Sequence, residues 1–262
     1  MRRRALKRIL LIIDPQNSFC DPTGELFVEG ANRDMERLTD FIERNGDAFS
    51  RVVVTLDSHN RMHIAHPAWW TDREGNPPAP FTAITAAEVQ NGNWRASTPE
   101  DQPWSQTYME ACGTHVIWPP HCLLGTWGHG VYRPLDAILS RWANRHTDLV
   151  MLPKGCSRYT EHFSIFQPKV MREGDPASGF HQSLLDDLAG FDEIYVAGEA
   201  SSHCVADSIR DLIAARPSLA TRVVLLTDAM SPVAGFQHLN DAFFTDMATA
   251  GVRTATTTED MN

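Results

Sequence analysis

Five short runs of aliphatic residues recur along the chain, separated by segments with helical periodicity. They are RILLIID, RVVVTLD, DLVMLPK, EIYVAGE and RVVLLTD, at residues 8–14, 51–57, 148–154, 193–199 and 222–228. Nearly continuous apolar runs of this length are typical of strands buried on both faces, as in a parallel sheet. A weaker run, GVRTATTT, follows the helical segment LNDAFFTDMATA and predicts a sixth strand at the edge of the sheet.

The segments between these runs predict helices. Between the first two runs, apolar residues recur at helical spacing and a glycine follows them: Met35, Leu38, Phe41, Ile42 and Gly46. After Cys204, a second apolar face is formed by Val205, Ile209, Leu212 and Ile213, and this helix stops near Pro217. Alternation of strands and helices predicts an α/β fold, a three-layer doubly wound sheet of about six mostly parallel strands.

Residues 71–117 break this alternation. The stretch is rich in Pro, Asn, Thr and Trp and lies where a compact α/β unit needs only a short connection. We interpret it as an insertion carrying one short helix around residues 83–90, with a role as surface decoration, as an oligomer contact or as a lid over a pocket. No internal repeat or linker divides the chain, so we expect a single domain over residues 1–262.

Composition excludes several classes of protein. The 42% hydrophobic content supports a large core, which excludes a disordered chain, and the 7 Trp favour an aromatic pocket or interface. The 33 acidic against 23 basic residues give a net charge of −10, which argues against a nucleic-acid-binding surface.

The N-terminus and the cysteines bear on location. The apolar stretch ILLII after the basic run MRRRALKR is too short for a signal sequence or a membrane span. The 5 Cys are widely spaced without a C-x-x-C pair, which fits reduced thiols better than disulfides or a structural zinc site. We therefore expect a cytoplasmic protein with no membrane partner.

Three of the predicted strands end in Asp14, Asp57 and Lys154, and a fourth leads to Cys204. Because the ligand crevice of such sheets lies at the carboxyl ends of the strands, they are expected to converge. A single aspartate at a strand end is commonly only a helix cap or turn former, but four reactive side chains together favour an active site.

Cys204 follows the small-residue turn GEASSH and begins a predicted helix. Unpaired N–H groups and the helix dipole favour an anion there, so we expect a lowered thiol pKa. A turn of small residues also lets backbone N–H groups approach a developing oxyanion. The alternative is a buried inert cysteine, the usual state of a free thiol.

Asp14 and Lys154 are candidates to assist this thiol. A carboxylate can take the thiol proton and later give it to a leaving amine, while an ammonium orients the carboxylate and stabilises the thiolate. His203 is the rival base, and we rank it lower because neighbouring residues at a helix start point apart.

The segment TLDSHNRMHIAH carries candidate metal ligands. Asp57 and His59 are separated by one residue, so on leaving a strand they face the same side. With a distant third ligand they would leave coordination positions open, as catalytic sites do, and the set suits Zn, Fe or Mn alike. The third ligand could come from His63, His66 or His121; His121 stands out because prolines and an aromatic brace it in WPPHC. Any one of these histidines could instead be a solvated loop residue.

Five motifs together resemble the nicotinamidase branch of the isochorismatase-like cysteine hydrolases. They are LLIIDPQNSFCDPTGEL, VVVTLDSH, WPPHCLLGTWG, LPKG and GEASSHCV, in the order that the family has them. They cover the chain from residue 8 to about 235, apart from the insertion. The resemblance implies an isochorismatase-like, Rossmann-like fold.

The resemblance also implies roles for individual residues. The catalytic triad is Asp14, Lys154 and Cys204. The metal ligands are Asp57, His59 and His121, with His66 resembling an extra histidine that some members carry near the metal. The oxyanion hole consists of the N–H groups of Ala200 and Cys204, after a cis peptide between Glu199 and Ala200. The substrate contacts are Phe19, Trp118 and Phe163 as an aromatic clamp. Glu199, which departs from the family pattern, is added as an expected substrate contact at a remodelled rim.

By the same resemblance, the reaction is hydrolysis of nicotinamide to nicotinate and ammonia in pyridine-nucleotide salvage and NAD biosynthesis. The pyridine nitrogen coordinates a divalent metal, zinc before iron or manganese, and the thiolate attacks the carboxamide carbon to give a thioester. The partner is a small-molecule amide, and a homo-oligomer is expected because the family often forms dimers or tetramers.

Departures from the family pattern leave the substrate open. Glu199 replaces a usually apolar residue, SSHC lacks an aspartate common before the nucleophile, and the longer KGCSRYTEHFS stretch puts Phe163 where Tyr is common. The alternatives are another small amide, a carbamoyl or a ureido compound on the same fold, and a non-catalytic metal-binding or thiol redox-sensing protein. The metal motif speaks against the first alternative and the complete triad against the second.

Overall fold

The computed structural model describes residues 6–261, and its centre is a six-stranded sheet. The strands are β1 (Arg8–Ile13), β2 (Arg51–Asp57), β7 (Leu149–Lys154), β8 (Glu193–Gly198), β9 (Val223–Leu226) and β10 (Arg253–Ala255). Their order is β10-β9-β8-β1-β2-β7, and all neighbouring pairs are parallel. The predicted strands and the weak edge strand are confirmed.

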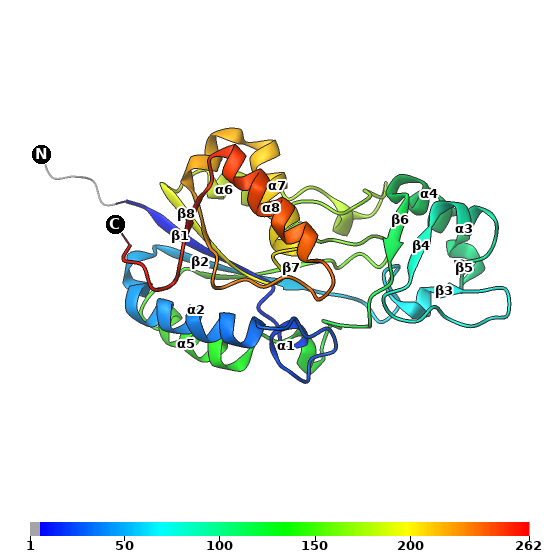
Figure 1. The fold of residues 1–262 in the computed structure, drawn as a ribbon, viewed down its shortest axis with the longest axis horizontal. Helices are drawn as coiled ribbons and strands as arrows, with labels where there is room; N and C mark the ends of the chain where they lie inside the picture. Colours follow the sequence, from blue (N-terminus) through cyan, green and yellow to red (C-terminus); the bar gives the residue numbers. More distant parts are fainter. Residues whose placement is uncertain (1–5, 262) are drawn as a thin grey trace, which may run out of the picture.

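Helices cover both faces of this sheet (Figure 1). On one face lie α2 (Ala31–Asn45) and α5 (Arg133–Ala143), with the short α1 (Asn17–Cys20) beyond the end of β1; on the other lie α6 (Gln182–Leu188), α7 (Cys204–Ala215) and α8 (Gln237–Ala250). Alternate residues of β1 serve the two cores: Leu10 and Ile12 pack toward α2, whereas Ile9, Leu11 and Ile13 pack toward α7. The predicted three-layer α/β architecture is confirmed.

Helix α2 buries the face that the sequence predicts. Met35 and Leu38 are fully buried in the core beneath the sheet. The glycine that follows has φ of −55°, so it does not serve as a left-handed cap. Instead, a Cβ at Gly46 would lie 2.9 Å from the Trp142 ring, and the Trp142 Nε1–H donates to the Gly46 carbonyl at 2.9 Å. Gly46 therefore allows α5 to approach α2 closely.

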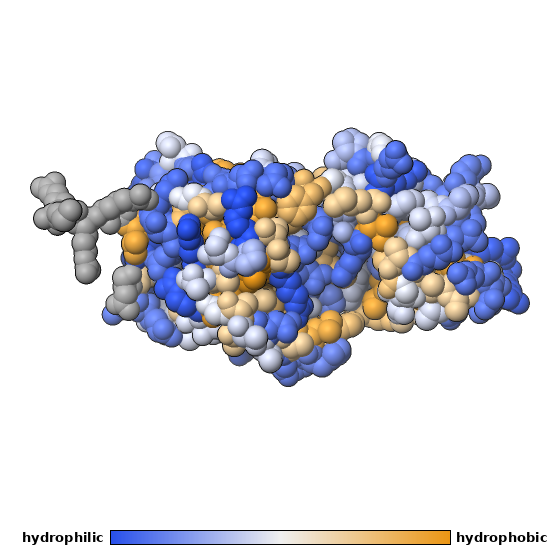
Figure 2. Space-filling model, turned by 90° about the horizontal axis from the view of Figure 1, so that it is seen from above, coloured by the Kyte–Doolittle hydropathy of each residue, from blue (hydrophilic) through white to orange (hydrophobic). Residues whose placement is uncertain are grey.

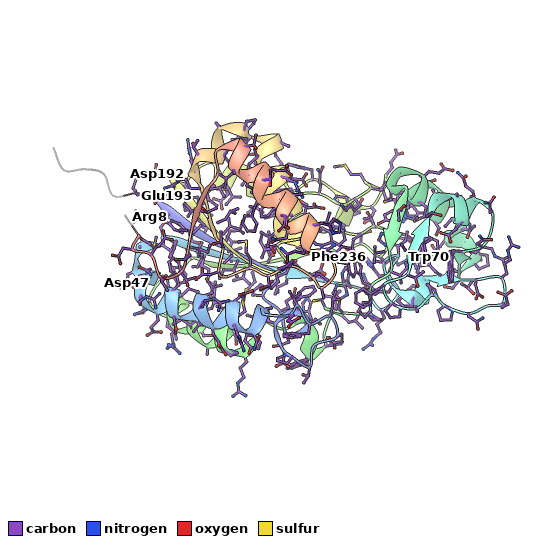
Figure 3. The ribbon with its side chains drawn as sticks, viewed as in Figure 1. Arg8, Asp47, Trp70, Asp192, Glu193 and Phe236 are labelled. Atoms are coloured by element: carbon purple, nitrogen blue, oxygen red, sulfur yellow. The ribbon has the colours of Figure 1, made fainter. Side chains whose placement is uncertain are left out.

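Residues 70–116, part of the connection between β2 and β7, form a separate lobe at one end of the sheet (Figure 1). It contains β3 (Trp70–Thr71), β4 (Ala83–Thr85), α3 (Ala86–Gln90), β5 (Arg95–Ala96), α4 (Gln102–Cys112) and β6 (Thr114–Val116). Strand β3 pairs with β5 and β4 with β6, both antiparallel. Its own hydrophobic cluster includes Trp69, Trp70, Ile84, Tyr108 and Met109; Figure 3 labels Trp70 within this lobe.

The expectation of a single helix over residues 83–90 is wrong in two respects. Residues 83–85 pair with β6, so the helix begins only after them, at a capping box formed by Thr85 and Glu88. A second helix, α4, was missed because its polar and aromatic residues give little periodicity, although Pro103 in its first turn is a helix-start signal. That the whole chain is one domain stays a prediction.

The surface, the helices and the cysteines can be compared with what the composition led us to expect. Polar residues cover most of the face seen in Figure 2, with apolar patches scattered among them. Within residues 6–261, every helix is too short or too polar to cross a membrane. All five cysteines are free thiols.

Candidate active site

Lys154 lies at the meeting point of the strand-end residues. Its Nζ is 2.9 Å from Asp14 Oδ2, 3.0 Å from Asp57 Oδ1 and 3.6 Å from Cys204 Sγ, and it donates to the His162 carbonyl at 2.6 Å. The ammonium is buried, with 6% of the residue exposed. Burial alone lowers its pKa, but the two carboxylates prevail and raise it well above its ordinary value. A permanent cation therefore faces the sulfur and both carboxylates.

Asp14 follows the last residue of β1 and is completely buried. Its backbone adopts a positive φ of 46°, rare for a non-glycine residue, which turns the chain at the strand end. The Thr55 hydroxyl accepts from the Asp14 N–H at 2.9 Å and donates to Asp14 Oδ1 at 2.6 Å. Burial raises the pKa of the carboxyl, and the Lys154 charge, which acts to lower it, does not cancel this effect. Asp14 therefore accepts a proton more readily than an exposed aspartate does.

Cys204 is the first residue of α7, as predicted, and is 7% exposed. Lys154 Nζ lies 3.6 Å from its sulfur. Burial raises the thiol pKa well above its ordinary value, although the Lys154 charge acts in the opposite direction. The expected lowering of the pKa by the helix end is therefore wrong for the resting site, because desolvation prevails. The sulfur keeps its proton until a base takes it.

The turn before Cys204 contains the expected cis peptide, between Glu199 and Ala200. The Ala200 carbonyl accepts from the N–H groups of His203 and Val205, at 3.0 and 3.1 Å. The N–H groups of Ala200 and Cys204 find no acceptor among residues 6–261. The turn that leads to Cys204 thus has an unpaired N–H donor at each end, as an oxyanion site requires.

Glu199 does not reach the substrate cavity, which corrects the expectation that it contacts the substrate. Its side chain is completely buried and accepts from the Ser231 N–H at 3.1 Å, and the Asp34 carboxylate of α2 is the nearby charge that acts on it most strongly. Burial, followed by the Asp34 charge, raises the Glu199 pKa well above 4.5, and burial raises that of Asp34. The side chain points into the core because residues of parallel strands alternate between faces, so the sequence position alone was misleading.

This carboxyl pair predicts a pH-dependent stability. Since the folded-state pKa of Glu199 is raised, the folded protein retains a proton that the unfolded chain releases above its ordinary value of 4.5. Stability should therefore fall as pH rises from 4.5 toward the folded pKa, by up to about 1.4 kcal/mol per pH unit for one proton. Glu199→Gln, which keeps the acceptor for Ser231 but cannot ionise, should reduce the slope. Urea unfolding between pH 5 and pH 7 measures it; parallel curves for parent and variant would rule out a proton held by Glu199.

Asp57, His59 and His121 converge beside this site. Their ligand atoms lie within 4.8 Å of one another. Asp57 Oδ2 is 2.8 Å from His59 Nε2 and 3.4 Å from His121 Nε2. Although burial acts to raise it, the charges of His59 and Lys154 hold the Asp57 pKa well below its usual range. The His121 Nδ1 lies 2.7 Å from the Pro119 carbonyl, which leaves Nε2 to face Asp57.

The Gln16 side chain fixes the Asp57 backbone. Its Nε2 donates to the Asp57 carbonyl at 2.8 Å, and its Oε1 accepts from the Asp57 N–H at 2.7 Å. Gln16 comes from the loop after β1, so one amide side chain locks the end of β2 to the end of β1. It was not among the predicted site residues; the signal was its place in DPQN beside Asp14.

His63 and His66 adjoin the metal-ligand candidates. The rings of both are completely buried, and their centroids lie 4.2 and 5.0 Å from that of His59. Burial lowers the pKa of each, so both are neutral at neutral pH. His66 lies in the cluster, as the sequence expectation requires, but its nitrogen groups with His59 and His63 rather than with Asp57 and His121.

A cavity opens over Cys204 and Asp57. Of the predicted substrate contacts, Phe19, Trp118 and Phe163 line it, together with His121 and Ala200. Sequence reasoning missed several residues of this wall: Leu26, Glu161 and Val233, and also His203, which it considered only as a rival base.

Two of these missed residues are polar. Glu161 Oε1 lies 3.9 Å from His59 Nε2, and Glu161 Oε2 is buried without a hydrogen-bond partner in the described chain. Burial lowers the His203 pKa to about 4, and its ring contacts Trp118 and Phe163. A neutral His203 is thus part of the aromatic wall. Glu161 could have been noticed from its place seven residues after Lys154 in the unusually long KGCSRYTEHFS stretch.

None of residues 71–117, all of which the structure describes, lines this cavity. Phe81 of this segment contacts a residue of the cavity wall: its ring lies edge-on to that of Trp118, with the centroids 5.9 Å apart. Phe236, labelled in Figure 3 where α8 begins, packs on Trp118 from another side at 5.7 Å. The lobe therefore supports the wall of the cavity through Trp118 and does not act as a lid in this structure.

Comparison with known proteins bears on the family and the fold of the chain. No protein-family model matches the chain. The nicotinamidase of Saccharomyces cerevisiae is 25% identical over 201 residues, which cover 76% of this chain and 77% of that protein. Among solved structures, a nicotinamidase/pyrazinamidase of Acinetobacter baumanii aligns with a TM-score of 0.66 and 22% identity, covering 98% and 99% of the two chains. A pyrazinamidase of Pyrococcus horikoshii in complex with zinc aligns with a TM-score of 0.57 and 18% identity, covering 95% and 99%.

Sequence similarity and fold thus point to the same group of proteins. The relatives span most of this chain, and the chain spans most of theirs. The resemblance noted from the five motifs is confirmed, and with it the fold class. The chain is a nicotinamidase-like hydrolase of amide C–N bonds with the isochorismatase-like α/β fold.

Proposed function

We propose that this protein hydrolyses nicotinamide to nicotinate and ammonia through a thioester on Cys204. The observation that carries the proposal is the position of Lys154 Nζ, within 3.6 Å of Cys204 and within 3.0 Å of Asp14 and Asp57. This arrangement joins a nucleophile, a base and a cation at one point, which acyl transfer requires. The nicotinamidase relatives support nicotinamide as the substrate.

The chain's own groups account for each proton. Asp14 takes the Sγ proton as sulfur attacks the carboxamide carbon, and Lys154 offsets the negative charge that develops. The N–H groups of Ala200 and Cys204 hold the oxyanion. As the C–N bond breaks, Asp14 gives its proton to the amine and ammonia leaves. Asp14 then takes a proton from a water that attacks the thioester, and the released thiolate recovers that proton as the acid departs.

The residues beside the triad fit a divalent metal. Both ring nitrogens of the buried His59 lack a hydrogen-bond partner in the described chain, although Nε2 lies 2.8 Å from an Asp57 oxygen. Such a contact outside hydrogen-bond geometry is explained by a shared cation. Asp57, His59 and His121 would hold it. One carboxylate with two imidazoles suits zinc, iron or manganese alike, and the zinc-bound pyrazinamidase with the same fold favours zinc. When bound, the metal supplies a Lewis-acid contact for the pyridine nitrogen of the substrate.

The cavity wall favours a flat aromatic amide. Phe19, Trp118 and Phe163 line the cavity together with Cys204 and His121. The rings of Phe19 and His121 are 5.3 Å apart and those of Trp118 and Phe163 are 6.2 Å apart, so two aromatic pairs contribute to its wall. Aromatic walls stabilise a ring by offset and edge contacts. A small aliphatic ureido or carbamoyl compound has no ring to use them.

Replacing a proposed ligand tests the metal site. His59→Ala removes one of the proposed ligands. Since loss of even an outer-shell partner lowers metal affinity by about 10–100-fold, the metal bound per chain at limiting zinc should fall at least tenfold. Elemental analysis after dialysis measures it. The control is His146→Ala, which replaces a partly buried histidine that pairs with Asp47 and should leave the ratio unchanged. An unchanged ratio in His59→Ala would contradict the assignment.

The thioester has a direct signature. Protein quenched with acid during turnover of nicotinamide should carry the acyl group on Cys204, detected by intact-mass spectrometry and peptide mapping. The contradicting result is that the acyl group is found neither in the parent nor in a slower Asp14→Asn variant under single turnover. Water would then attack the carboxamide carbon directly.

The wider setting belongs to the same proposal. Release of ammonia and a pyridine carboxylate places the enzyme in pyridine-nucleotide salvage leading to NAD. Five free thiols support a reducing, cytoplasmic location. We keep the homo-oligomer as an expectation for sedimentation measurements and the single domain with an insertion at 71–117 as the unit of folding.

A further inference from the structure

Four buried imidazoles lie side by side at the carboxyl end of β2, and they form two ligand sets. One set is Asp57, His59 and His121; the other is His59, His63 and His66, with one ring nitrogen from each within 4.8 Å of the others. The three rings of the second set are completely buried. Their centroids are 4.2, 5.0 and 5.2 Å apart for the pairs 59–63, 59–66 and 63–66. The two sets share His59 alone.

The nitrogens of the second set lack partners in the described chain. His63 Nδ1 accepts from the Ala65 N–H at 3.2 Å, but His63 Nε2 and both nitrogens of His66 are buried and unpaired. An unpaired buried polar atom costs about 1–3 kcal/mol. Three such nitrogens on adjoining rings are unexpected in a folded core unless something binds them.

We propose that His59, His63 and His66 form a second divalent-cation site beside the first. His59 Nε2 lies against Asp57 Oδ2, so its Nδ1 is the nitrogen left for the second ion. His59 would then ligate both ions and release its N–H proton to solvent. His63 would ligate through Nε2 in the tautomer with its proton on Nδ1, so the 3.2 Å contact with the Ala65 N–H would be given up. Three imidazoles favour zinc, copper or nickel over magnesium or calcium. The inference rests on the proposed function only through this shared histidine.

The second ion has a structural place rather than a catalytic one. Neither His63 nor His66 lines the cavity over Cys204. Both lie in the segment that leads from β2 into the lobe with β3 and α4, where the His63 carbonyl accepts from the His66 N–H and the His66 carbonyl from the Trp69 N–H. An ion held there would connect His59, just after β2, to His63 and His66, just before the lobe. We therefore expect it to raise the melting temperature without contacting substrate.

Zinc counting on the full-length protein tests the proposal. Metal-free protein is dialysed against buffered Zn²⁺, and zinc per chain is measured by elemental analysis. The parent should bind two ions, and this count needs no variant. A ratio of one in the parent would overturn the proposal, while leaving the Asp57 site and the amide hydrolysis intact.

Single substitutions then assign the second ion. His63→Gln and His66→Gln should each reduce the ratio from two to one, and both should lower the zinc-dependent gain in melting temperature. His115→Gln is the matched control, since His115 is also buried in this region but belongs to neither set, and it should keep both ions. A ratio of two in folded His63→Gln and His66→Gln proteins would place the second ion elsewhere and reject this site.

Discussion

Replacing Cys204 by Ala lowers kcat for amide hydrolysis by roughly 10⁴-fold or more, on the scale seen when a catalytic nucleophile is removed. Of the five free cysteines, Cys204 is the one that lines the cavity, and its sulfur lies 3.6 Å from Lys154 Nζ, so no other thiol is placed to form the thioester. The fold survives because only one small buried atom is lost. Steady-state ammonia release and a melting curve measure the two effects.

Cys112→Ala is the matched control for this prediction. Cys112 is a free, half-buried thiol at the end of α4, outside the cavity over Cys204. Its removal should leave kcat within about twofold, consistent with the small effect of most changes away from functional sites. A Cys204→Ala protein with kcat within tenfold of the parent would exclude a thioester mechanism.

Lys154→Met should affect both stability and activity. Without the ammonium, Asp14 and Asp57 remain buried without their common cation. Breaking a buried ion pair in this way destabilises a protein by about 3–5 kcal/mol, and one carboxyl is expected to take up a proton. Urea unfolding should show the loss, and ammonia release should fall because Asp14 and the sulfur are no longer held together.

An exposed ion pair provides the comparison for Lys154. Arg141 and Glu43 are both more than half exposed and 2.9 Å apart, so Arg141→Met should change stability by less than about 1 kcal/mol. A Lys154→Met protein as stable as Arg141→Met would show that the two carboxylates need no cation, contrary to the charge balance described above.

The sheet and the meeting of the strand-end residues were predictable because both follow from local pattern. The aliphatic runs of β1, β2, β7, β8 and β9 are long enough to require burial on both faces. Parallel strands end at one edge of a sheet, so Asp14, Asp57 and Lys154 had to approach one another. Their separations of 2.9 and 3.0 Å depend on Thr55 and Gln16, which hold the ends of β1 and β2 in register.

The features that escaped prediction depend on long-range packing. The Cys204 pKa is raised because tertiary contacts bury a thiol that local helix geometry alone would acidify. Glu199 faces Asp34, more than 160 positions earlier in the chain, so its direction could not be read from its neighbours. Likewise, His66 meets His59 and His63 through the conformation of the loop, which the spacing of the three histidines leaves open.

The most direct measurement is ammonia release from nicotinamide by the purified protein, first as isolated, then after chelation, and then after Zn, Fe or Mn is added back. The account predicts release that disappears with the metal and returns with it, because Cys204 and the Asp57, His59 and His121 set face one cavity. Ammonia release that is unchanged after complete metal removal would contradict the metal site. No release in any state would contradict nicotinamide as the substrate.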